Sequence, residues 1–188
     1  MKRRILVICL LLIISGCDDM SRTADRPEKE IPVELEKPVQ PAMSMPDEMP
    51  EDFQFSVHFG VNLNNAFDTY QGTVTKDLIE NGVAHAKLSL TTTELTQVYD
   101  EMKSIHVFAQ KKFIPPKTND TVCVQDPHED EEWSITVNGE TITHHISGAF
   151  CEPTEDAKQF RQLRDMIWAI IEKKEAYRKL PEAVGGYD

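Results

Sequence analysis

The sequence lacks an apolar run long enough to cross a bilayer, which takes about 20 predominantly apolar residues. Its most apolar stretch extends only from Ile5 to Ile14, with Cys9 inside it, and follows the basic residues Lys2, Arg3 and Arg4. A short apolar run behind a basic start is typical of a signal peptide. We therefore expect this segment to be cleaved rather than retained as a membrane-spanning anchor.

The residues after the apolar run differ from an ordinary secretory cleavage site. In LLIISGCDDM, residues 11–20, Ser15 and Gly16 lead directly into Cys17, a pattern that resembles the bacterial lipobox. The resemblance implies a signal peptide over residues 1–16 and a mature chain that starts at Cys17, which carries diacylglycerol and palmitate. Two long acyl chains hold a protein stably on a membrane. We expect a lipid-anchored protein on the extracytoplasmic face of the cell membrane; the alternative is a soluble secreted protein with a chance cysteine.

The chain also lacks an excess of positive charge. It has 20 Lys and Arg against 32 Asp and Glu, and its formal net charge is −12. The predicted signal peptide holds three of the bases and none of the acids, so the mature chain is more acidic still. Proteins bind nucleic acid through clustered Lys and Arg that neutralise phosphates. Nucleic acid is therefore not an expected partner.

Glycine is missing from residues 18–52, which instead hold six prolines and eleven acids against four bases. Such a composition favours an extended, self-repelling chain without a packed core. We interpret residues 17–52 as a lipid-attached, Pro-rich acidic linker. Residues 53–188 then form a single extracytoplasmic domain, long enough to bury a core of its own.

Hydrophobic periodicity gives the order of elements in this domain. FQFSVHFGV at 53–61 alternates as a half-buried strand does, and 70–78 and 83–90 are two further strand candidates joined through Asn81-Gly82. Residues 91–105 have a helical apolar stripe behind a capping box of Thr91 and Glu94. A short strand at 121–125 and a hairpin of 133–137 with 140–146 follow, and a last helix runs from Thr154 to a stop at Pro181. The order predicts an α+β domain, an antiparallel sheet with two helices packed on it.

Local signatures of catalysis are missing as well. The sequence contains no GxSxG, SxxK, HExxH, GxxxxGK or GxGxxG pattern. Catalytic groups assembled from distant residues leave no such trace. We expect a non-enzymatic binding or structural module, with no catalytic residue, no metal ligand and no cofactor to assign, and with a possible protein partner in the cell envelope.

Two cysteines remain once Cys9 is removed and Cys17 is lipidated. Cys123 and Cys151 bracket the predicted hairpin, and an even pair in an oxidising compartment predicts a disulfide. The competing interpretation is a metal site made of both thiols with His144 or His145. Adjacent strand residues point to opposite faces, so only one of the two histidines is easily a ligand.

The acidic run DPHEDEE at 126–132 is interpreted as a solvated loop. Its oxygens could collect calcium, but it has no glycine at the bend that such loops use. His58 and His85 fall on the polar faces of their strands, where solvent-facing histidines are common. The alternative function is a hydrolase or metal-handling protein that uses the strand histidines together with this acidic loop, His128 included.

With these elements in place, the chain resembles an uncharacterised bacterial membrane lipoprotein family. The likeness lies in the lipobox and in four segments: TVTKDL at 73–78, LTTTELTQVYDEM at 90–102, ITVNGETIT at 135–143 and LPEAVGGYD at 180–188. The resemblance implies a membrane-tethered extracytoplasmic protein and carries no activity or cofactor. In the last segment we expect the chain to turn at Gly185 and Gly186 and to seat Tyr187 on the domain; a docking tag for a partner is the alternative.

Overall fold

The computed structural model describes residues 44–117 and 122–187, which form one antiparallel sheet with helices packed against it. The strands lie in the order β4-β3-β2-β1-β5-β6, and every neighbouring pair is antiparallel. This confirms the α+β class. The strands are β1 (Gln54–Gly60), β2 (Asn65–Asp68), β3 (Thr73–Asp77), β4 (Val83–Lys87), β5 (Asp130–Val137) and β6 (Glu140–Ile146).

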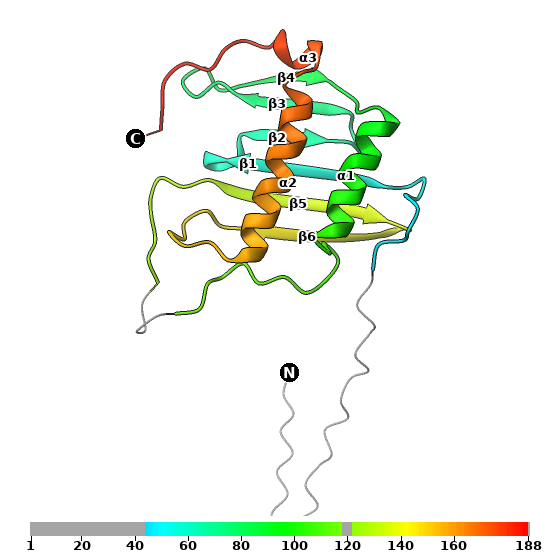
Figure 1. Ribbon diagram of the computed structural model, residues 1–188. Helices are drawn as coiled ribbons and strands as arrows, with labels where there is room; N and C mark the ends of the chain where they lie inside the picture. Colours follow the sequence, from blue (N-terminus) through cyan, green and yellow to red (C-terminus); the bar gives the residue numbers. More distant parts are fainter. Residues whose placement is uncertain (1–43, 118–121, 188) are drawn as a thin grey trace, which may run out of the picture. The chain divides into compact units, whose positions relative to one another are not determined.

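Two helices lie on the same face of the sheet, which we call the covered face (Figure 1). They are α1 (Thr92–Ser104) and α2 (Glu155–Ile171), and a short α3 (Glu175–Arg178) follows next to β4. Alternate strand residues point into the core between sheet and helices, as the sequence pattern predicts. The largest fully buried side chains there are Trp133, Tyr99, Phe55, Phe67, Phe160 and Met102.

The helix boundaries follow from their caps. Thr91 and Glu94 form the predicted capping box, with the Thr91 hydroxyl accepting from the Glu94 N–H and the Glu94 carboxylate accepting from the Thr91 N–H. Thr154 caps α2 in a similar way, through the N–H of Ala157. The prediction of one last helix from Thr154 to Pro181 is partly wrong, because α2 ends at Ile171. Lys174 has an extended backbone conformation, which separates α2 from α3, and it is the N-cap residue of α3.

Two strand predictions also need correction. β2 was not predicted, because it is only four residues long and its sequence, NAFD, has one large apolar side chain. It follows a 3-10 turn, Val61–Leu63, in which Asn62 and Leu63 adopt positive φ angles of 57° and 58°. The expected strand at 121–125 is reduced, in its described part, to a single antiparallel bridge between Val124 and Phe150.

Packed structure begins before residue 53, inside the segment that the sequence assigns to the linker. Met45 is buried in the core, and the carbonyl of Pro46 accepts a hydrogen bond of 2.8 Å from the Tyr99 hydroxyl. Asp52 accepts from the N–H of Asn138 in the β5–β6 turn, at 3.0 Å. We call residues 44–52 the strap, because they tie α1, through Tyr99, to the turn of the β5–β6 hairpin, through Asn138.

Among the described residues, no helix combines the length and the apolar character that crossing a membrane requires. The predicted signal peptide, Cys17 and the linker up to residue 43 lie outside the described residues.

Candidate functional site

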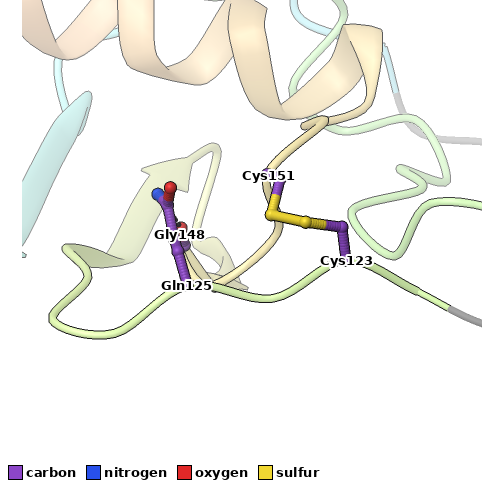
Figure 2. The surroundings of a disulfide bond; sticks show 4 residues. All are labelled: Cys123, Gln125, Gly148 and Cys151. Atoms are coloured by element: carbon purple, nitrogen blue, oxygen red, sulfur yellow. Dashed lines mark hydrogen bonds between the residues drawn. A yellow bond between two sulfur atoms is a disulfide. The ribbon is translucent and has the colours of Figure 1, made fainter.

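The predicted disulfide between Cys123 and Cys151 is confirmed. The two Cα atoms are 5.5 Å apart, and the bond closes a loop with a sequence separation of 28. Figure 2 shows the bond beside the side chain of Gln125, which donates to the carbonyl of Gly148 at 3.2 Å. The N–H of Gln125 also donates to the carbonyl of Ala149. The bond therefore fastens two segments that also hydrogen-bond to each other, and it removes both thiols as metal ligands.

The acidic run at 126–132 is not a solvated loop throughout, which corrects the sequence interpretation. β5 begins at Asp130, and Glu131 points into the covered face with only 3 % of its surface exposed. The signal was present in the sequence, because Glu131 continues the alternation of Trp133, Ile135 and Val137. The charge of this first inward residue makes it resemble the acidic loop that precedes it.

Glu131 is paired with Arg164 of α2 inside the domain. One Glu131 oxygen accepts from Arg164 Nη1 at 2.9 Å, and the other accepts from the Trp133 indole N–H at 3.1 Å. Arg164 also lies over the ring of Phe59, 5.0 Å from its centre, and contacts Asp165 on the outer side. Burial raises the pKa of Glu131, while Arg164 and the indole N–H act in the opposite direction. This buried pair was missed from the sequence, because nothing local marks Arg164 as its partner.

His128 stands at a small hollow of about 310 Å³ at one end of β5. Its Nδ1 is 3.5 Å from an Asp126 oxygen and its Nε2 is 3.5 Å from an Asp130 oxygen. The opposite wall is the 3-10 turn with Asn62 and Leu63. The two ring nitrogens thus face different carboxylates, so they do not converge on one position.

The two histidines of β6 have different environments. His144 points into the covered face, where its Nε2 lies 2.8 Å from the carbonyl of Val107 and its ring packs edge-on against Phe160 and Phe113. Burial lowers the pKa of His144. The side chain of His145 is 61 % exposed on the opposite face, and its Nδ1 is 3.5 Å from a Glu132 oxygen. Of these two histidines, only His145 has its side chain exposed to solvent, as the strand alternation predicts.

The face of the sheet opposite α1 and α2, which we call the open face, brings polar residues of several strands into one row. Strand register places His58 directly between Ala66 and Glu132, and Glu132 directly between His58 and His145. Further along the same row, the Thr75 hydroxyl is 2.9 Å from Nδ1 of His85. His58 and His85 are exposed, as predicted from their strands.

The row therefore joins two of the strand histidines to one member of the acidic run. The four other histidines are apart from this pair: His85 is in the same row but three strands from His58, His106 follows α1, His128 is at the hollow, and His144 is in the core. Within residues 44–117 and 122–187, no group of three His, Cys, Asp or Glu side chains is arranged so that it could hold a metal ion.

The C-terminal segment packs on the domain, as expected from its glycines. The Tyr187 hydroxyl donates to a carboxylate oxygen of Asp77 at 2.6 Å and accepts from the side-chain amide of Asn64 at 3.2 Å. Gly185 adopts a φ of +100°, and Val184 forms a parallel bridge with Ile79. Tyr187 is thereby seated at the end of β3, with 39 % of its surface exposed.

Comparison of the chain with protein-family models, with curated proteins and with solved structures gives no match. The likeness to bacterial lipoproteins stays a prediction from the sequence.

Proposed function

We propose that this chain is a membrane-anchored extracytoplasmic lipoprotein, held by lipid on Cys17, whose domain is a non-enzymatic binding or structural module. The observation that carries the proposal is the passage from a ten-residue apolar run, through Ser15 and Gly16, into Cys17. The disulfide between Cys123 and Cys151 supports export, because such bonds form and persist on the oxidising side of a membrane.

The use of the buried polar groups supports a module without catalysis. Perturbed carboxyls and histidines are candidates for acid-base chemistry when they sit in a cleft. Here Glu131 is held by Arg164 and Trp133, and His144 is held by Val107 and two aromatic rings. Each is thus engaged in holding the sheet to the helices.

The anchor is tested by metabolic labelling with palmitate in cells that carry the full chain. We expect Cys17→Ser to abolish labelling and membrane retention, and globomycin, an inhibitor of the lipoprotein signal peptidase, to block processing of the unaltered chain. Cys9→Ser is the matched control, since Cys9 lies in the segment to be removed; it should label normally. A labelled, membrane-bound Cys17→Ser protein would refute the proposal.

Export is tested separately through the disulfide. Protein taken from its native compartment, alkylated without reduction and analysed by mass spectrometry, should contain a linked pair of peptides holding Cys123 and Cys151. On the chain-entropy model, a disulfide that closes a loop of this length stabilises a fold by about 3 to 4 kcal/mol. Two freely alkylated thiols at these positions would contradict an oxidising location.

A second candidate function is favoured by one observation, the row on the open face. The sequence alternative of a hydrolase or metal-handling protein combined strand histidines with the acidic run, and register places Glu132 of that run between His58 and His145.

A further inference from the structure

We propose that Asn81 is a site of spontaneous covalent modification, at which the side-chain amide is converted to a carboxylate. We propose further that the strap protects Asn138, which lies in the same dipeptide, from this reaction. The only co-reactant is water, and the product is aspartate or isoaspartate. The proposal concerns the folded domain and does not depend on the lipid anchor.

The reaction is a ring closure within the chain. The backbone nitrogen of the residue after an asparagine attacks the side-chain carbonyl carbon. A new C–N bond forms, the amide C–N bond breaks, and ammonia leaves with the proton of the attacking nitrogen. Water then opens the five-membered imide at one of its two carbonyl carbons, adding its hydroxyl to the carbon and a proton to the nitrogen. Glycine favours the attack, because it has no Cβ to hinder its nitrogen and leaves the backbone free to turn.

The sequence contains two Asn-Gly dipeptides, and both connect neighbouring strands. Asn81-Gly82 lies between β3 and β4, and Asn138-Gly139 lies between β5 and β6. All four residues are exposed, so access to water does not distinguish the two turns. Any difference in reactivity therefore depends on how the fold holds each glycine nitrogen.

The turn of Asn138 is held at both of its N–H groups. Asp52 of the strap accepts from the Asn138 N–H through one carboxylate oxygen, at 3.0 Å, and from the Gly139 N–H through the other, at 2.5 Å. The Gly139 nitrogen is the atom that would attack, so ring closure has to break a hydrogen bond to a charged group, which is of the strong kind. The pairing of Val137 with Glu140 fixes both ends of this two-residue turn as well.

The turn of Asn81 is held at other atoms. The Glu80 N–H donates to the carbonyl of Val184 at 3.2 Å, and the carbonyl of Gly82 accepts from the Leu78 N–H at 2.8 Å. The Gly82 N–H has no hydrogen bond to another residue within 44–117 and 122–187. The position that a Cβ of Gly82 would occupy has no neighbouring atom within 4 Å. The attacking nitrogen is thus unhindered at Asn81 and engaged at Asn138.

The test is incubation of the folded full chain, purified in detergent, in a mildly alkaline buffer made with heavy-oxygen water. Alkali helps the attacking nitrogen to lose its proton, and water supplies the new oxygen atom, so only product formed during the incubation carries the label. Peptide mass spectrometry follows positions 81 and 138 in the same sample. Conversion at Asn81 should be at least about tenfold faster than at Asn138, since a hydrogen bond to a charged group is worth about that factor.

Two variants and one condition locate the cause. Asp52→Ala removes the carboxylate that holds the hairpin turn, so conversion at Asn138 should rise toward the rate at Asn81, while Asn81 keeps its own rate. Asn81→Gln should leave position 81 unlabelled, because its ring would be larger and closes more slowly. In concentrated urea, where the fold no longer acts, the two dipeptides should convert at similar rates. Asp52 and Asn81 are exposed, and circular dichroism checks that both variants are folded.

The inference is overturned if position 81 of the folded chain gains no label, or if Asn138 converts as fast as Asn81 in the fold. It is also overturned if Asp52→Ala leaves the rate at Asn138 unchanged, because the protection would then not come from the strap. Label in the corresponding peptide of Asn81→Gln would place the reaction at another residue. Palmitate labelling tests the anchor separately and has no bearing on these rates.

Discussion

The two faces of the sheet use the same kinds of residue for different purposes. On the covered face, a carboxylate and a histidine are fixed: Glu131 by Arg164 and Trp133, and His144 by the carbonyl of Val107. On the open face, the next residue of each strand, Glu132 or His145, is exposed and contacts its partner only at 3.5 Å. Residue type alone therefore does not indicate function here.

The difference comes from strand alternation, which sends residues one position apart into opposite environments. Glu131 and Glu132 are neighbours in sequence, as are His144 and His145, and each pair is divided between the faces. A polar group in the core must have its hydrogen bonds satisfied and becomes part of the packing. A polar side chain on the open face is free to change rotamer and is accessible to a ligand from solvent.

The largest effect should come from breaking the buried pair on the covered face. Arg164→Ala leaves the Glu131 carboxylate buried without its cation, which typically costs about 3 to 5 kcal/mol of unfolding free energy. Chemical denaturation followed by circular dichroism measures the loss. Arg161→Ala is the matched control, because Arg161 lies on the same helix but is exposed.

The pair can also be replaced rather than broken. Glu131→Gln together with Arg164→Met removes both charges and keeps much of the volume, so most of the lost stability should return. If Arg164→Ala costs no more than Arg161→Ala, the covered face does not depend on this pair and the comparison of the two faces fails at its main point.

A smaller loss is expected where the strap closes the covered face. Met45 is 8 % exposed and belongs to the core, whereas Met49 is only partly buried. Met45→Ala should lower the unfolding free energy by about 2 kcal/mol, at the lower end for buried methionine. Met49→Ala should cost less in the same denaturation experiment. Equal losses would mean that the strap has no fixed register on the domain.

Much of the covered face was predictable from the sequence, because its contacts follow from local patterns. Phe55, Val57, Trp133 and Ile135 are buried as their alternation indicates, and the cap of α1 forms as Thr91 and Glu94 predict. The hairpin turn has a local signal in the Asn138-Gly139 dipeptide, whose residues both adopt positive φ angles. The disulfide has a signal in the even number of cysteines that remain in the mature chain.

Several of the missed features depend on partners distant in sequence. Arg164 is 33 residues from Glu131, and the Tyr99 hydroxyl that binds the strap is 53 residues from Pro46. The open-face row needs the order of the strands, because His58 and His145 come near Glu132 only once β1 and β6 both lie beside β5. Periodicity shows which face a residue points to, but not which strand is next to it.

The smallest expected effect is the pH dependence that His144 contributes from the covered face. Burial lowers the pKa of His144 below its ordinary value of 6.5. Below that value the unfolded chain takes up a proton at this position while the folded chain does not, so stability should fall with decreasing pH until the lower folded pKa is reached. One such group contributes a slope of at most about 1.4 kcal/mol per pH unit. Denaturation midpoints measured over this range should fall less steeply in His144→Gln than in the unaltered chain. Comparing slopes rather than absolute stabilities removes the separate cost of losing the contact between His144 and Phe160, and an equal slope in the two proteins would show that burial does not hinder His144 from taking up a proton in the fold.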